Sequence, residues 1–428
     1  MAWPWHRRPD ARLPFARSLP VFKPSAPAAL GLVAALVWPF ASAASPSELS
    51  FQEVLSLARQ RAPALLDAAG RVAEAQGPVA GASPWLRDNP TVSFELGPRT
   101  HDDLRGTQLS LGISQPIELG GKQGARRDAA RAGLQRQDAE QQDAERRVLG
   151  EVGAAFLRAL YARELSRLMH QTEEAARSLS DSTGKRFDAG DVPVVDVNVA
   201  KVALARARAA VVTARGEEQA LLDELRALLG LPLQEALAVR GVLRELASLP
   251  VAAASGTKER PDLVAIESEL AQAEADLKLG RAEGWPDVSV GVRYEKEVDE
   301  TALVGTLSVP LPVFSRGQEA KVTGDARVRR LRTALESARR ARDAQVEAAR
   351  VRDASRQQAL AVLETEALPL LDENESLAKR SYEAGEMDLA GLLLVRRETL
   401  ETRVALLDSH LQAALARVQL AVEMGVLP

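Results

Sequence analysis

The fold of this chain follows from a stretch that occurs twice, as Phe187-Asp188-Ala189-Gly190-Asp191 and, 195 residues later, as Tyr382-Glu383-Ala384-Gly385-Glu386. Each copy has an aromatic residue three positions before a glycine and an acidic residue directly after it. Long helical patterns flank both copies, and a glycine at such a place can adopt the left-handed conformation that ends a helix. The two stretches therefore predict two helical hairpins of the same design.

Four other pairs of similar segments follow the same order, with spacings between 194 and 198 residues. They are 61–65 with 260–263, 89–93 with 285–289, 114–117 with 308–311, and 230–232 with 425–428. Similar landmarks in one order indicate a tandem duplication. We predict repeat 1 at 44–232, repeat 2 at 260–428 and an equatorial linker at 233–259.

Each repeat is predicted to begin with a helix of roughly 24 residues that starts at Pro63 or Pro261, because proline is tolerated in a first turn. The hydrophobic period then becomes two, over 90–115 and 286–311, as in Val92, Phe94 and Leu96. This alternation predicts a strand pair with one apolar and one polar face. Strands of 8–10 residues match a tilted crossing of a bilayer, although a soluble sheet packed on helices stays open as an alternative.

Long helical runs follow each strand pair, at 121–187 and 317–382, and shorter ones at 191–230 and 386–425. The first long run has no proline over 67 residues, which corresponds to about 100 Å of helix. The two shorter helices of a repeat have nearly the same combined length. We therefore predict that they lie end to end beside the long one.

The N-terminus has the pattern of a secretory signal over 1–43: basic residues, an apolar segment at 28–40 and the cleavage pattern Ala41-Ser42-Ala43. Removing it leaves 50 basic and 58 acidic residues, a net charge of −8. This balance argues against nucleic acid as a partner. Since the sequence has no cysteine, disulfides and lipidation of a terminal cysteine are excluded.

Four strands cannot close a barrel, and an open sheet edge in lipid leaves backbone groups unpaired. Closure must then come from further copies. Two copies would give eight strands, whose interior is filled by side chains, whereas three would give twelve with room for a passage, so a trimer is preferred if the protein conducts. The predicted fold is mainly α with a small β part. Each chain would contribute four strands and a wall four helices wide.

The whole mature sequence resembles the TolC-like outer membrane factors, through the repeated hairpin stretches and through Gln115-Pro116-Ile117-Glu118-Leu119-Gly120-Gly121-Lys122. The latter is similar to the branch that serves heavy-metal efflux pumps of the cobalt-zinc-cadmium resistance type. The resemblance implies a homotrimer in the outer-membrane lipid of a Gram-negative cell, with its helices in the periplasm. In this fold, tandem-duplicated long helices form a trimeric α-barrel, and four strands per chain contribute to a shared 12-stranded transmembrane β-barrel. It also implies a periplasmic adaptor and an inner-membrane transporter of the RND type as partners.

In that family the hairpin ends form the periplasmic aperture and the adaptor-binding surface. The matching residues here are Phe187, Gly190, Asp191, Asp196, Tyr382, Gly385, Glu386 and Asp388. Rings of carboxylates favour cations, but acids in a first helical turn also complement the helix dipole. The second repeat departs from its relatives, because Gly391 and Met387 stand where an acid and a base are often found. If the second repeat contributes acids to a constriction, Glu386 and Asp388 are the better candidates. Charge reversal at both residues together is predicted to weaken the preference of the pore for cations.

A second candidate site is the strand-to-helix turn formed by Pro116, Glu118, Gly120, Gly121 and Lys122. Pro116 is expected to end a strand, the glycines permit the turn, and Lys122 begins the helix. An ordinary turn without further function is the alternative interpretation.

The sequence contains no P-loop, dinucleotide fingerprint, nucleophile elbow or zinc-type spacing, so no cofactor, metal site or catalysis is predicted. Passive efflux of heavy-metal cations is the leading hypothesis. Three alternatives stay open: a drug or secretion duct of the same fold, a periplasmic adaptor, and an exported hydrolase.

Overall fold

The computed structural model describes residues 47–101, 104–248, 259–297 and 300–426. The predicted signal at 1–43 lies outside this described part. The helices are α1 (Phe51–Arg61), α2 (Pro63–Ala82), α3 (Lys122–Asp188), α4 (Val194–Leu229), α5 (Leu243–Ser248), α6 (Pro261–Ala282), α7 (Gln318–Val362), α8 (Leu368–Glu383) and α9 (Leu389–Met424). The strands are β1 (Ser47–Leu49), β2 (Thr91–His101), β3 (Leu104–Ile117), β4 (Leu237–Val239), β5 (Val288–Lys296) and β6 (Thr301–Ser308).

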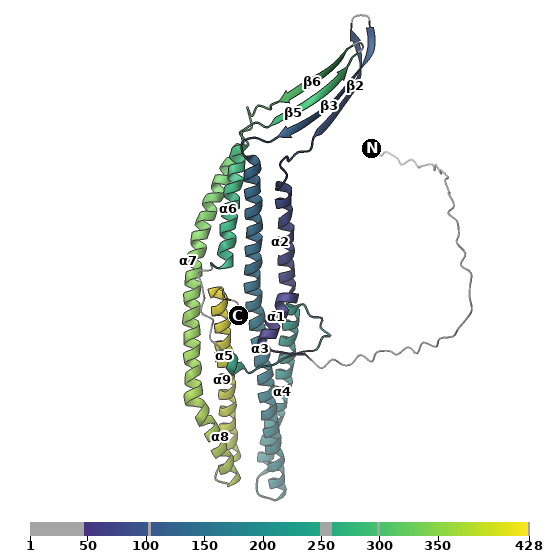
Figure 1. Ribbon diagram of the computed structural model, residues 1–428. Coiled ribbons are helices and arrows are strands. Elements are labelled where there is room, and N and C mark those ends of the chain that lie inside the picture. Colours follow the sequence, from purple (N-terminus) through teal and green to yellow (C-terminus); the bar gives the residue numbers. More distant parts are fainter. Residues whose placement is uncertain (1–46, 102–103, 249–258, 298–299, 427–428) are drawn as a thin grey trace, which may run out of the picture. The chain divides into compact units, whose positions relative to one another are not determined.

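The first repeat is built on α3, which runs without a break over 67 residues. Both α2 and α4 pack along it (Figure 1). The end of α4 meets the start of α2, since a Cβ on Gly230 would lie 2.9 Å from the Arg61 carbonyl oxygen and 3.1 Å from the Pro63 ring. The end-to-end arrangement predicted from the helix lengths is therefore present.

The second repeat has the same plan, with α6 and α9 packed against α7. The prediction of one long helix over 317–382 is wrong in one respect. A π turn, Leu363–Ala367, separates α7 from α8, and the N–H of Leu368 donates to the Leu363 carbonyl. Pro369 has no N–H to donate to the carbonyl four residues earlier, so a helix that continues past this point must rearrange its hydrogen bonds.

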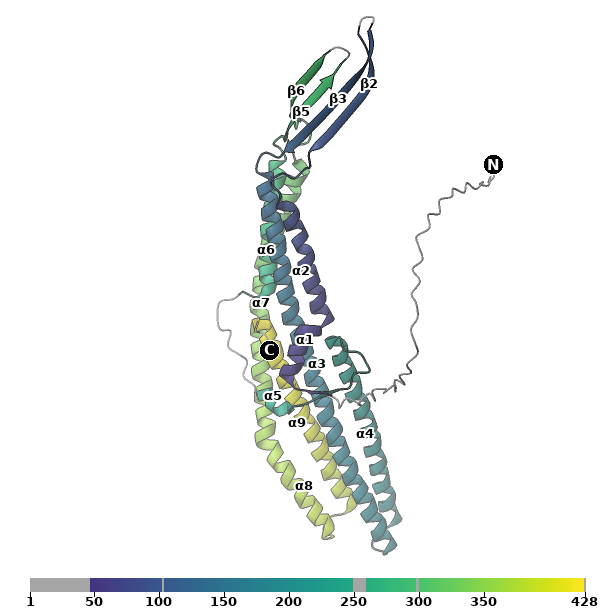
Figure 2. The same cartoon turned by 45° about the vertical axis from the view of Figure 1, so that its right-hand side comes forward.

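The four-stranded sheet has the order β2-β3-β5-β6, with every neighbouring pair antiparallel. The central β3–β5 pair joins the two repeats and places Leu111 opposite Tyr294. Apolar side chains such as Val92 and Phe94 are exposed on its surface. Figures 1 and 2 show the sheet at one end of the long helices and the hairpin turns at the other.

A small layer covers the middle of the helices. Parallel strands β1 and β4 pair there, and α1 and α5 pack with them on α3, α4 and α9. The largest hydrophobic core lies in this layer and includes Leu55, Phe156, Leu160, Leu225 and Leu243. The segment expected as a linker at 233–259 thus contributes β4 and α5 to this core. No described helix is long and apolar enough to span a bilayer.

Candidate functional site

The first hairpin turn, between α3 and α4, is closed by Gly190, whose φ of 85° is in the left-handed region. The N–H of Asp191 donates to the Arg186 carbonyl at 2.8 Å, the bond that typically accompanies a helix-ending glycine. Asp191 is exposed, and the half-buried Asp196 lies in the first turn of α4. The turn therefore has the geometry that the sequence predicts.

The second hairpin turn, between α8 and α9, is closed in the same way by Gly385, with a φ of 78°. The Glu386 N–H donates to the Ser381 carbonyl at 2.8 Å. Asp388 is the N-cap of α9, and its Oδ1 accepts a hydrogen bond from the Gly391 N–H at 2.7 Å. Its contact is thus that of a helix cap, whereas Glu386 is exposed and makes no side-chain bond within the described residues.

The aromatic residues of the two turns differ in their surroundings. Phe187 is 42% exposed, whereas Tyr382 is 9% exposed and packs with Leu179 of α3. The guanidinium carbon of Arg186 lies 5.4 Å from the centre of the Tyr382 ring, which joins the two turns by a cation–π contact. Burial also lowers the pKa of Arg396 beside them, although Glu375 and Tyr382 act in the opposite direction.

The strand-to-helix turn between β3 and α3 is built around Glu118. Its two carboxylate oxygens accept from Arg126 at 2.7 and 2.8 Å, and Arg87 lies 3.5 Å away. The hydrogen bonds from Arg126 hold the pKa of Glu118 below its usual value, although partial burial acts in the opposite direction. The side chain is therefore an ionised anchor for the first turns of α3.

Lys122 connects this turn to the second repeat. Its Nζ donates to Asp287 Oδ1 at 2.7 Å and to the Trp285 carbonyl at 3.0 Å, and the side chain is buried. The N–H of Leu119 also donates to Asp287 Oδ1, at 3.2 Å. Gly120 is required here because a Cβ would lie 2.9 Å from the Trp285 side chain. The turn is therefore a joint between the two repeats.

One detail of this turn differs from expectation. Pro116 does not end the strand, because β3 continues to Ile117 and Pro116 pairs with Ser289. On the other side of β3 the pairing with β2 stops at Ser114. Proline lacks an N–H for the ladder, and such a position near a strand end tolerates this lack.

Comparisons with known proteins agree with this architecture. Residues 54–231 match the family model described as outer membrane efflux protein. Over these residues, which lie within repeat 1, the chain is similar to the outer membrane efflux protein family. It is 24% identical to the cobalt-zinc-cadmium resistance protein CzcC of Cupriavidus metallidurans, over 72% of this chain and 75% of that protein. It is 28% identical to the nickel and cobalt resistance protein CnrC of the same organism, over 72% and 74%.

Among solved structures, CusC, whose structures describe transmembrane channel formation, matches with a TM-score of 0.73. The identity is 18%, and the match covers 89% of this chain and 93% of that one. These three relatives have the names of resistance and channel proteins rather than of enzymes. The chain thus has the TolC-like fold of outer-membrane efflux channels.

In this fold the predicted residues form two separate groups. The aperture candidates gather at the two hairpin turns, and the residues of the strand-to-helix turn lie at the other end of α3. The described residues contain no group of three or more side chains suited to hold a metal ion. Sequence reasoning missed Asp287 and Trp285 as partners of Lys122. Their segment was visible as a repeat landmark, but nothing local indicates a contact across 165 residues.

Proposed function

We propose that this protein is the passive exit duct of a tripartite efflux system, working as a homotrimer with a periplasmic adaptor and an inner-membrane RND transporter. The observation that carries the proposal is the open sheet. In the described part, β2 and β6 each have only one neighbouring strand, and exposed apolar side chains lie along the sheet. Such a sheet needs other copies to complete its hydrogen bonds in lipid.

The repeat supports a specific pairing between copies. Within one chain, Ile113 of β3 lies opposite Val292 of β5, and Ser114 lies opposite Gly291. The repeat shifts β3 to β6 by 194 residues and β5 to β2 by 196. The same geometry between copies therefore places Leu307 opposite Leu96 of the next copy, and Ser308 opposite its Glu95. This register pairs apolar with apolar and polar with polar side chains.

Disulfide cross-linking tests this register, because the sequence contains no cysteine. The double variant Glu95→Cys with Ser308→Cys should form cross-linked trimers on oxidation, since directly opposed residues fall within the Cα separation of about 4.4–6.8 Å that a disulfide needs. The matched control, Glu95→Cys with Thr306→Cys, shifts one partner by two positions on the same strand face. Equal cross-linking of both variants would reject the register, and recovery of monomers alone would reject closure by three copies.

The cargo we propose is heavy-metal cations, and the names of CzcC and CnrC support this class. Asp191 and Glu386 are exposed at the hairpin turns, with Asp196 and Asp388 close by in sequence. Repeated by threefold symmetry, these acids would form carboxylate rings that favour cations. Phe187, Gly190, Tyr382 and Gly385 would then shape the aperture and the surface for the adaptor.

Reversal potentials in planar bilayers test the proposed preference for cations. The wild-type protein should prefer cations, and Glu386→Lys with Asp388→Lys should weaken that preference. Because Asp388 also caps α9, the control is Asp388→Asn, which keeps a capping side chain and removes one charge. Unchanged selectivity in the double variant would exclude both residues from the aperture. Loss of cobalt, zinc and cadmium tolerance on deletion of the gene would support the cargo, and unchanged tolerance would contradict it.

A further inference from the structure

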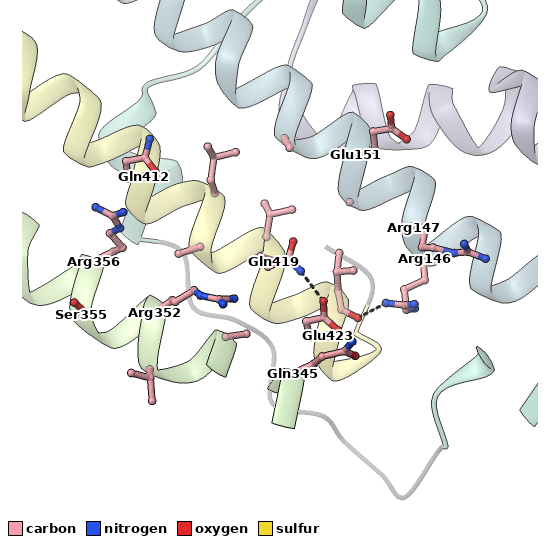
Figure 3. A pocket seen from close by; sticks show the side chains of 18 of the residues that line it. Arg146, Arg147, Glu151, Gln345, Arg352, Ser355, Arg356, Gln412, Gln419 and Glu423 are labelled. Atoms are coloured by element: carbon pink, nitrogen blue, oxygen red, sulfur yellow. Dashed lines mark hydrogen bonds between the residues drawn. The ribbon is translucent and has the colours of Figure 1, made fainter. Parts of the chain in front are cut away.

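A groove rich in arginine lies halfway along the helices, where α9 ends beside the start of α6. It has a volume of about 990 Å³ and is lined by residues of α3, α7 and α9 together with Arg260 (Figure 3). None of the residues considered above for the aperture or the strand-to-helix turn contributes to it. It is therefore a separate feature of the molecule.

On α3, the exposed arginines of the groove lie on the face opposite the small layer of β1, β4, α1 and α5. Leu149 and Phe156 of α3 belong to the core that packs under this layer. Arg158 and Arg147 each lie nine residues from one of them along α3. Since nine residues are about two and a half helical turns, both arginines emerge on the opposite face.

The charge of the lining is strongly unbalanced, with six arginines against two glutamates among its described residues. The arginines are Arg146, Arg147, Arg158, Arg260, Arg352 and Arg356. This excess is unusual in a chain with more acidic than basic residues overall. It makes the groove attractive to anions.

Two of these arginines hold the fold together. Arg146 donates to the Val422 carbonyl at 2.9 Å and to Asp143 Oδ1 at 2.7 Å. Arg260 forms a bidentate pair with Asp262 at 2.7 and 2.8 Å and binds Glu423 at 2.9 Å. Both side chains are only 8% exposed. Their charges are therefore compensated within the chain.

The other arginines are not compensated in this way. Arg158, Arg352 and Arg356 are exposed and make no hydrogen bond or ion pair within the part of the chain that the structure describes. The acid next to Arg352 in sequence, Asp353, pairs with Arg417 instead, at 3.3 Å. Arg147 shares Asp143 with Arg146 and is 67% exposed. Free guanidinium groups from α3 and α7 thus border one cavity.

We propose that this groove binds a soluble oxyanion with two or more negative charges, of the phosphate or diphosphate class. Guanidinium groups match the oxygen geometry of phosphate and bind it in a bidentate manner. Several arginines around one anion give an attraction that a single exposed ion pair lacks. Arg147 lies 25 residues into α3, about 37 Å along the helix from the strands, so a lipid headgroup is out of reach.

Isothermal titration of the full-length protein with inorganic diphosphate in metal-free buffer tests the proposal. We expect one saturable site per chain. Arg158→Gln, Arg352→Gln and Arg356→Gln together should weaken binding at least about tenfold. Glu151→Gln should tighten it about two- to threefold, because Glu151 is an exposed acid of the same lining with no partner among the described residues.

The matched control is Arg206→Gln, Arg215→Gln and Arg329→Gln, three exposed arginines of α4 and α7 outside the groove. It should bind diphosphate as the wild-type protein does. Absence of saturable binding, unchanged affinity in the groove variant, or an equal loss in the control would overturn the proposal. All lining residues belong to one chain, so this result is independent of trimer formation and conduction. Circular dichroism of each variant shows whether it is folded.

Discussion

The two repeats share one plan, but their long helices differ in how they are supported. α3 buries 22 of its 67 residues, because four helices pack against it: α2, α4, α6 and α9. α7 buries only five of its 45 residues, and it is followed by the π turn and α8. The central helix therefore stays regular, whereas the helix with fewer neighbours accommodates Pro369 by a rearranged turn.

The joints between sheet and helices differ as well. Gly121 and Gly317 occupy the same repeat position, and both are N-caps in the left-handed conformation. Lys122 and its repeat counterpart Gln318 follow them. Lys122 reaches the second repeat, whereas Gln318 bonds locally, with its Nε2 donating to the Phe314 carbonyl at 2.8 Å. Equivalent residues thus fasten the repeats in one place and only shape a loop in the other.

The largest expected difference between the repeats is in the paired variants Gly317→Ala and Gly121→Ala. A Cβ on Gly317 would collide with the Gly280 carbonyl oxygen, while a Cβ on Gly121 would meet open space. Both variants bear the left-handed strain of roughly 1–2 kcal/mol, and the collision should raise the cost at Gly317 to about 3 kcal/mol. Thermal unfolding in detergent, followed by circular dichroism, measures both. Equal melting temperatures would contradict the comparison.

The next largest difference in stability is expected between Lys122→Met and Gln318→Met, the variants at the residues that follow the two N-cap glycines. Removing the lysine leaves Asp287 and the Trp285 carbonyl without this donor, and breaking a buried pair costs roughly 3–5 kcal/mol. Since Asp287 is 39% exposed, we expect about 2 kcal/mol. Gln318→Met should cost less than about 0.5 kcal/mol, as at most surface positions. A similar loss for both variants would show that Lys122 does not fasten the repeats.

The sequence predicts the repeating plan well because that plan depends on local signals. The end of α3 at Asp188 and the start of α9 at Leu389 follow from glycines and helix periodicity. The contact of Lys122 with Asp287 depends on β3 pairing with β5, which no local pattern encodes. The π turn was missed for another reason. Pro369 is visible, but proline can start, kink or rearrange a helix, and packing decides among these.

A smaller difference is expected at the hairpin turns, where Asp388 caps α9 by its side chain and Pro193 is the N-cap of α4 without such a bond. Asp388→Ala should cost about 1 kcal/mol and Asp388→Asn only a few tenths, because asparagine caps nearly as well. Pro193→Ala removes no cap bond and should be close to neutral. Thermal unfolding again gives the measurement. Equal losses for the alanine and asparagine variants would mean that charge at Asp388, and not capping, stabilises this turn.

The smallest expected effect is a difference in how the two strand-to-helix turns make the stability of the protein depend on pH. Glu118, three residues before Gly121, is ionised and bound by Arg126, whereas Phe314, three residues before Gly317, is 90% exposed and has no charge to titrate. The folded pKa of Glu118 lies below its unfolded value. Its contribution is therefore complete above the unfolded pKa of about 4.3 and is lost as the pH falls through the folded pKa.

Glu118→Gln should accordingly destabilise the protein by about 0.5 kcal/mol at neutral pH, and the difference from wild type should shrink steadily below pH ~4.3. Phe314→Ala is the control and should differ from wild type by the same amount across this range. Melting temperatures measured over a series of acidic buffers decide the question. A gap between Glu118→Gln and wild type that stays constant down to acidic pH would mean that the Arg126 pair contributes no pH-dependent stability, and that the two turns differ in shape alone.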